Sequence, residues 1–188
     1  MSRDLPAPWG EFLSEIDDAL EAPVALHCLG GFVGAICYGF ARTTNDLDYL
    51  EIVPLSAQTA LEHLAGRQSA LARKHGVYVQ HFSLVTLPDC YADRLTDLFA
   101  ARFRRLRLHA LEAHDLALSK LSRDSPVARE DVAHLARTVP LDPELLRRRY
   151  RHELRPVAIG DPALLDRRLD RWIAAYFPGT DSASTRGR

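Results

Sequence analysis

The sequence predicts an α/β fold, with a small mixed sheet in the first half of the chain and helices in the second half. Three observations lead to this prediction. The apolar run "VALHCL" has the length of a buried strand, ends at a Gly-Gly pair and is soon followed by the alternating run "DLDYLEIV". Two later segments, "VYVQHFSLVTL" and "RFRRLRLHALE", also have strand character. From His114 onward, apolar residues recur at helical spacing.

The remaining elements are expected in order around these strands. "WGEFLSEIDDAL" places apolar residues on one face of a helix. A short buried helix is expected from about Phe32 to Phe40, and "TALEHLAGRQSALARKHG" is interpreted as one helix that ends near Gly76. We expect residues 1–112 to form the core, residues 113–178 a helical region packed on it, and residues 179–188 a flexible tail.

Composition and charge limit the class of protein. A hydrophobic content of 47% and a charged content of 26% are ordinary for a soluble globular chain. The net charge of -1 gives no overall attraction to nucleic acid or to a membrane, so any such affinity must come from local patches. Three cysteines without CxxC spacing, and an N-terminus without an apolar signal core, favour a cytoplasmic protein with reduced thiols.

One stretch could be mistaken for a membrane span. Between Ala22 and Ala41 there is no Asp, Glu, Lys or Arg, and about 20 apolar residues are enough to cross a bilayer. Pro23 and four glycines weaken a single long helix through this region. A buried strand, a tight turn and a core helix explain the same composition, and we therefore expect no membrane segment.

The residues after this stretch suggest a site for phosphate and metal. A Gly-Gly turn between a strand and a helix leaves backbone N–H groups free for phosphate oxygens. Asp46 and Asp48 lie two apart on a strand, so both carboxylates point to one face. Together they predict a site for Mg²⁺ bridging a nucleoside triphosphate (NTP). Taken singly, a Gly-Gly pair is more often a packing turn, and Asp-x-Asp is more often a solvated strand end.

This combination resembles a known signature. "LGGFVGAICYGFARTTNDLDYL" is similar to the motif of the DNA polymerase β-type nucleotidyltransferase superfamily. The spacing of Arg42, Thr44, Asp46 and Asp48 resembles that of the AbiEii/MenT-like toxin nucleotidyltransferases. Those proteins usually carry a second signature, a lysine in one helix and an aspartate that opens the next. "HDLALSKLSRDSPVAREDVAHLAR" matches it with Lys120 and Asp131.

The resemblance implies a polymerase β-like core and an activity of EC 2.7.7 type, the transfer of a nucleoside monophosphate from an NTP. It implies that Asp46 and Asp48 hold Mg²⁺ and that Lys120 neutralises phosphate charge. Asp131 would orient Lys120 or activate the attacking hydroxyl; alternatively, it is a charge at a helix N-terminus. The expected nucleotide-binding residues are Gly30, Gly31, Phe32, Arg42 and Thr44. The group also implies a toxin that modifies tRNA 3′ ends and is neutralised by an antitoxin protein.

Two features leave alternatives open. Many relatives add a third carboxylate from a neighbouring strand, where this chain has Gln80 and His81. His81 could help at the metal or be a structural histidine, two aspartates could suffice, or activity could be impaired. That last alternative describes a nucleotide-binding regulatory module without catalysis. Nucleotidylation of a small molecule or a protein is a further alternative to RNA.

Arginine clusters bear on the acceptor. We expect one cluster in the last candidate strand and another in a single helix, and each would either contact RNA phosphates or form a solvated face paired with acidic residues. The candidate RNA-binding residues are Arg102, Arg104, Arg105, Arg147 and Arg148.

Overall fold

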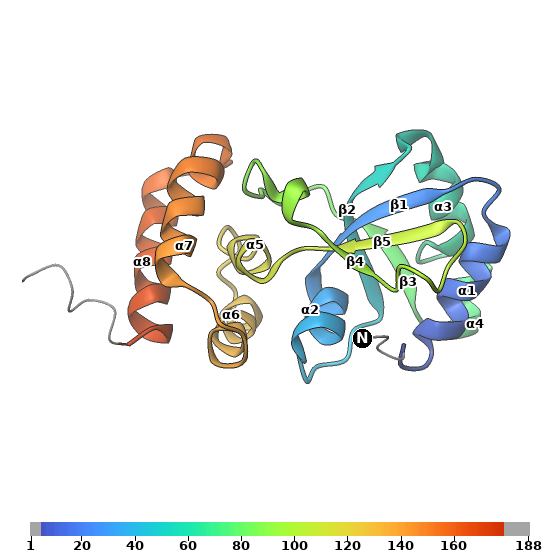
Figure 1. Ribbon diagram of the computed structural model, residues 1–188, viewed down its shortest axis with the longest axis horizontal. Coiled ribbons are helices and arrows are strands. Elements are labelled where there is room, and N and C mark those ends of the chain that lie inside the picture. Colours follow the sequence, from blue (N-terminus) through green and yellow to red (C-terminus); the bar gives the residue numbers. More distant parts are fainter. Residues whose placement is uncertain (1–4, 179–188) are drawn as a thin grey trace, which may run out of the picture. The chain divides into compact units, whose positions relative to one another are not determined.

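The computed structural model describes residues 5–178, and the predicted tail at 179–188 lies outside them (Figure 1). The chain forms two compact units. Unit 1 comprises the residues up to Leu84 together with Ala92–Glu112. Unit 2 comprises Val85–Tyr91 together with the residues from Ala113 onward.

Unit 1 contains the mixed sheet that the sequence predicted, with β4 as a fifth strand beyond the four expected. Its strands are β1 (Val24–Leu29), β2 (Asp46–Val53), β3 (Tyr78–His81), β4 (Thr96–Leu98) and β5 (Leu106–Ala110). They are arranged in the order β3-β2-β1-β5-β4. β1 pairs antiparallel with β2 and parallel with β5, β3 pairs parallel with β2, and β4 pairs antiparallel with β5. The α/β class with a small mixed sheet is therefore confirmed.

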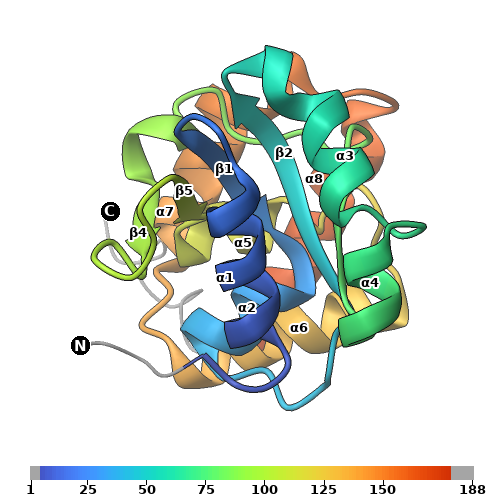
Figure 2. The same ribbon diagram turned by 90° about the vertical axis from the view of Figure 1, so that its right-hand side faces the viewer.

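Four helices accompany this sheet in the described part of unit 1: α1 (Trp9–Ala19), α2 (Gly30–Tyr38), α3 (Gln58–Ala65) and α4 (Ala70–His75). Helices α1, α3 and α4 lie along one side of the sheet (Figure 2). The apolar face of α1 is fully buried at Phe12, Leu13 and Ile16. Burial of this apolar surface stabilises the unit.

The prediction of a single helix over "TALEHLAGRQSALARKHG" is wrong, because α3 ends at Ala65 and Gly66 is its C-cap. A Cβ atom at Gly66 would lie only 2.3 Å from the carbonyl oxygen of Glu62, so only glycine fits this close approach. A new helix begins after Ser69, whose hydroxyl accepts a hydrogen bond of 3.0 Å from the N–H of Ala72. The predicted end near Gly76 is correct: Gly76 is the left-handed C-cap of α4, with φ +72°.

Unit 2 is helical, as the periodicity predicted. Its helices are α5 (Ala113–Leu118), α6 (Pro126–Thr138), α7 (Pro143–Arg149) and α8 (Pro162–Tyr176), with a π-helical turn at Tyr150–Leu154 and a 3₁₀ turn at Arg155–Val157. Three of them begin with the same device, a capping side chain followed by proline: Ser125-Pro126, Asp142-Pro143 and Asp161-Pro162. Within the described residues, no helix combines the length and apolar character needed to cross a bilayer.

Candidate nucleotide and metal site

Asp46 and Asp48 share one face of β2, as the period of a strand predicts. Both are partly exposed, whereas Leu47 and Tyr49, which alternate with them, are completely buried on the opposite face. The hydroxyl of Thr44 donates a hydrogen bond to the Oδ1 atom of Asp46. This bond fixes the first carboxylate, so the start of β2 presents two oriented acidic groups.

Gly30 brings the second carboxylate against the start of α2. Its φ of +75° lies in the left-handed region that glycine adopts most readily. A Cβ atom at this position would lie 2.3 Å from the Oδ2 atom of Asp48. Backbone conformation and close approach therefore both require glycine, and the Asp48 carboxylate lies directly beside the turn from β1 into α2.

Two side chains of the loop before β2 lie close to Gly31, the second residue of α2. A Cβ atom at Gly31 would lie 3.0 Å from the Oγ1 atom of Thr44 and 3.4 Å from the Nη1 atom of Arg42. Both side chains thus reach the first turn of α2, where backbone N–H groups have no partner within the helix. The Phe32 side chain is buried, with its ring centroid 4.7 Å from that of Trp9, so it anchors this turn in the core.

The strand next to β2 settles the positions of Gln80 and His81. In the parallel pairing, Gln80 is the partner of Asp48 and His81 is the partner of Tyr49. The side chain of Gln80 therefore shares the face of the two aspartates. His81 lies on the other face, with its ring 5.3 Å from that of Tyr49 and its Nε2 atom 3.0 Å from the carbonyl oxygen of Leu50. The interpretation that His81 helps at the metal is wrong; it is a structural histidine.

The donor set at Asp46 and Asp48 fits Mg²⁺. This cation usually takes one or two protein carboxylates and completes its octahedral shell with water and substrate phosphate oxygens. Within residues 5–178, no group of three or more histidine, cysteine, aspartate or glutamate side chains is placed to hold a metal ion. Two carboxylates beside the first N–H groups of a helix suit a cation that is shared with a bound triphosphate.

Comparison with protein families agrees with this geometry. The model of a family described as nucleotidyltransferases of unknown function, DUF6036, matches residues 11–162, more than half of the chain. The chain belongs to the DUF6036 family. No curated protein and no solved structure matches it significantly. The expected nucleotidyltransferase class is thus supported, and the finer resemblance to AbiEii/MenT-like toxins stays a prediction.

The matched region of this DUF6036 chain includes the second signature, which lies in unit 2. The Nζ atom of Lys120 is 2.8 Å from the Oδ2 atom of Asp131, and both residues are buried. Their expected positions need correction. Lys120 lies in the turn after α5 ends at Leu118, and Asp131 lies inside α6, which begins at Pro126. Asp131 therefore does not open a helix. Its observed role is to hold the lysine, and the phosphate contact of Lys120 stays a prediction.

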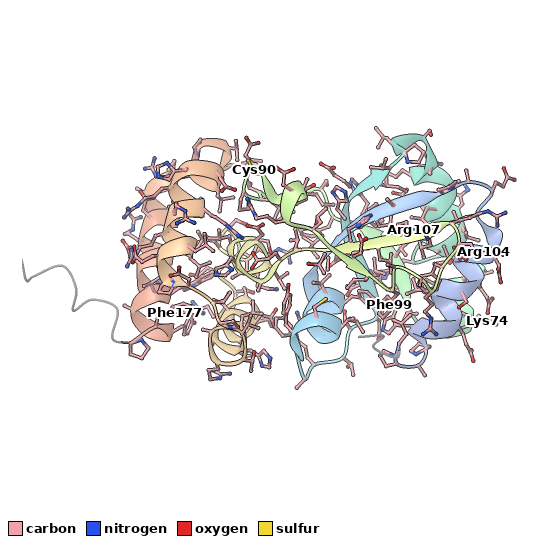
Figure 3. All side chains as sticks on the ribbon, viewed as in Figure 1. Lys74, Cys90, Phe99, Arg104, Arg107 and Phe177 are labelled. Atoms are coloured by element: carbon pink, nitrogen blue, oxygen red, sulfur yellow. The ribbon has the colours of Figure 1, made fainter. Side chains whose placement is uncertain are left out.

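The candidate RNA-binding arginines are divided between the two units. Arg102, Arg104 and Arg105 precede β5 instead of lying in it, and α7 ends at Arg149 rather than carrying the whole second cluster. Arg104, labelled in Figure 3, forms a 2.9 Å ion pair with the exposed Asp18. Arg147 forms one of 2.7 Å with Asp170. These two arginines thus pair with acidic residues, as the second interpretation of the clusters predicted.

Unit 1 contains two polar features that the sequence did not reveal. The carboxylate of Asp17 accepts hydrogen bonds of 2.9, 2.6 and 2.7 Å from the backbone N–H groups of three residues before and at the start of β5. A row of four side chains also crosses β2, β1, β5 and β4 in register: Glu51, His27, His109 and Asp97. Burial lowers the pKa of His27, although the nearby charge of Glu51 opposes this effect. Neither feature has a sequence signal, because both depend on strand pairing.

Proposed function

We propose that this protein transfers a nucleoside monophosphate from an NTP to an acceptor hydroxyl in an Mg²⁺-dependent reaction. The observation that carries this proposal is the contact of the Asp48 carboxylate with Gly30, which brings the acidic pair of β2 to the N-terminus of α2. Phosphate oxygens would accept hydrogen bonds from the first N–H groups of α2, and the helix dipole favours their negative charge. Arg42 would neutralise further phosphate charge beside Gly31.

The reaction joins the acceptor oxygen to the α-phosphorus of the NTP. The bond from that phosphorus to the oxygen of the β-phosphate breaks, pyrophosphate leaves, and the hydroxyl proton passes to solvent. Mg²⁺ bound by Asp46 and Asp48 would supply Lewis-acid stabilisation of the phosphate charge and make the acceptor hydroxyl more acidic. Thr44 would keep the Asp46 carboxylate oriented through its hydroxyl hydrogen bond. The Asp48 carboxylate would keep its position against Gly30 throughout.

The acceptor in this proposal is the 3′ end of a tRNA, and the role is that of a toxin with a cognate antitoxin in the cytoplasm. The support is the spacing of Arg42, Thr44, Asp46 and Asp48, which resembles that of toxin nucleotidyltransferases. Exposed Arg102 and Arg148 are cations that could contact an RNA backbone.

The test incubates the purified protein with each labelled NTP, Mg²⁺ and total RNA. We expect label in the tRNA fraction, its loss on addition of EDTA, and a decrease of at least about 100-fold in Asp48→Asn, since metal sites commonly lose 10–100-fold even through changes outside the ligands. Glu51→Gln is the matched control, because Glu51 lies on the same strand and is exposed. Labelling that persists in Asp48→Asn would exclude this site as the catalytic one.

Expression in cells tests the biological role separately. Wild type should slow growth and extend tRNA 3′ ends, and Asp48→Asn should do neither. If label enters a small molecule or a protein and tRNA ends are unchanged, the acceptor is not tRNA, although the proposed transfer reaction still holds.

A second candidate function is nucleotide binding without turnover. It is favoured by Gln80, which occupies the position beside Asp48 where a third carboxylate would lie and brings no charge for a second metal ion. Calorimetry separates the two functions. Mg²⁺-dependent NTP binding in the absence of any transfer identifies the binding module, and Gln80→Glu should then gain activity.

A further inference from the structure

Unit 1 contains a pocket that lies outside the proposed nucleotide and metal site. Its volume is about 800 Å³, within the range of small-molecule sites. One wall comes from the C-terminal half of α2 and the other from β4 and the segment that follows it. The lining residues are Ile36, Cys37, Tyr38, Thr96, Asp97, Leu98, Phe99, Ala100, Ala101 and Arg102.

The pocket is separate from the acidic pair, although α2 contributes to both. Gly30 and Gly31 begin the helix beside Asp48, whereas Cys37 lies near its other end. At 1.5 Å per residue, Gly31 and Cys37 are about 9 Å apart along the axis. A ligand in this pocket therefore does not occupy the position of phosphates held at the start of α2.

The apolar side of the pocket is built around an unusual residue. Phe99 has a φ of +57°, in the left-handed region that a bulky side chain rarely adopts. A backbone hydrogen bond of 2.8 Å from the N–H of Arg102 to the carbonyl oxygen of Phe99 closes this turn. The phenyl ring lies edge-on to that of Phe103, with centroids 6.5 Å apart. Such outliers are concentrated at functional sites, where a side chain must be held in one direction.

The polar side of the pocket favours an anion. Within residues 5–178, no carboxylate pairs with the guanidinium of Arg102, which is exposed. Asp97 is in contact with His109, and the hydroxyl of Tyr38 donates a 2.8 Å hydrogen bond to the carbonyl oxygen of Leu111. Arg102 is the cation among the lining residues, with its Nη2 atom close to Gly10 of α1, and a guanidinium suits a carboxylate or a phosphate.

We propose that the pocket between α2 and β4 binds a small organic anion with an aromatic or aliphatic body. Its carboxylate or phosphate pairs with Arg102, and its body packs on Phe99, Ile36 and Leu98. The site is additional to the transfer site and does not depend on the proposed function. A ligand here contacts the end of α2, whose beginning holds the phosphate-binding turn.

Cys37 provides a direct probe of occupancy. It lines the pocket and is half-buried, whereas Cys28 is completely buried and that burial raises the pKa of its thiol, which makes it unreactive. Replacing the exposed Cys90 (Cys90→Ser) leaves Cys37 as the thiol that alkylates. The rate of iodoacetamide labelling, followed by intact mass spectrometry in EDTA, is measured with indole-3-acetate, adenosine 5′-monophosphate or tryptamine.

Indole-3-acetate or adenosine 5′-monophosphate should slow labelling about tenfold at ten times its dissociation constant. Protection by indole-3-acetate indicates a carboxylate ligand, and protection by adenosine 5′-monophosphate indicates a phosphate ligand. Tryptamine carries the indole ring with a positive charge and should not protect. Arg102→Gln should abolish protection. Arg104→Gln should keep it, because Arg104 pairs with Asp18 and does not line the pocket.

Three outcomes would overturn the inference. They are no protection by either anion at millimolar concentration, equal protection by tryptamine, and protection that survives Arg102→Gln. Asp48→Asn distinguishes this site from the transfer site, because protection in EDTA should be unchanged in that variant even though its transfer activity is lost.

Discussion

Substitution of Gly30 by alanine tests the geometry of the acidic site most directly. The change introduces two costs. A non-glycine residue at φ +75° is strained by about 1 kcal/mol. The new methyl group would also start 2.3 Å from the Oδ2 atom of Asp48, and relieving this overlap costs about 2 kcal/mol. We therefore expect Gly30→Ala to lower the free energy of unfolding of unit 1 by about 3 kcal/mol.

Gly76→Ala is the matched control. Gly76 has a φ of +72°, and nothing lies within 4 Å of a Cβ atom built there, so this variant has the strain without the overlap. It should lose only about 1 kcal/mol. The assay is urea unfolding followed by the fluorescence of Trp9, a buried residue of unit 1, in a Trp172→Phe background.

A double-mutant cycle isolates the contact itself. In an Asp48→Ala background the carboxylate is absent and only the Cβ atom of residue 48 remains, 3.2 Å away. Gly30→Ala should then cost little more than Gly76→Ala, which gives a coupling energy of about 2 kcal/mol. If Gly30→Ala and Gly76→Ala cost the same in the wild-type background, Asp48 does not pack against Gly30 and the site is assembled differently.

Two further predictions concern ionic groups. Lys120→Ala leaves the buried Asp131 without its 2.8 Å partner and should destabilise unit 2 by about 3 kcal/mol in urea unfolding followed by Trp172. Lys74→Ala removes an exposed ion pair of unit 1 and should cost little in the same assay followed by Trp9; similar losses in both variants would contradict this difference in burial. Asp17→Ala removes three backbone hydrogen bonds and should cost unit 1 about 2 kcal/mol, whereas Asp18→Ala, which affects an exposed pair, should have little effect. Burial alone would raise the pKa of Asp17, but the hydrogen bonds from those N–H groups outweigh burial, and the pKa is lowered. The stabilisation by Asp17 should therefore be complete at neutral pH and be lost as the pH falls through that lowered pKa. Equal acid sensitivity of wild type and Asp17→Ala would refute this.

The part of the site that the sequence could predict is local. Asp46 and Asp48 lie two apart on a strand, so their common face follows from the period of the backbone alone. The Gly-Gly turn directly follows the preceding strand, and the two strands pair antiparallel although α2 lies between them in the sequence. The pairing of two successive strands therefore brings Asp48 to Gly30, and both belong to one continuous segment of the chain.

The parts that the sequence could not predict depend on pairing between distant segments. Gln80 and His81 are neighbours in sequence, and only the register of β3 against β2 determines which of them faces Asp48. Asp17 contacts residues that are 87 to 89 positions away. The pocket borders β4, a strand of three residues without a periodic pattern. The second signature predicts Lys120 within a helix, although α5 ends two residues earlier.

The central place of β1 has a consequence for the growing chain. One edge of β1 pairs with β2, the next strand in the sequence. Its other edge stays unpaired until β5 is synthesised, after every other strand of the sheet. During synthesis, "VALHCL" is therefore an edge strand that is almost entirely apolar, and such edges recruit other chains. Once β5 docks, Asp17 from α1 binds the backbone N–H groups at its start and holds it in place. Aggregation of newly made protein should thus depend on how quickly residues 104–110 reach β1, more than on the stability of the finished sheet.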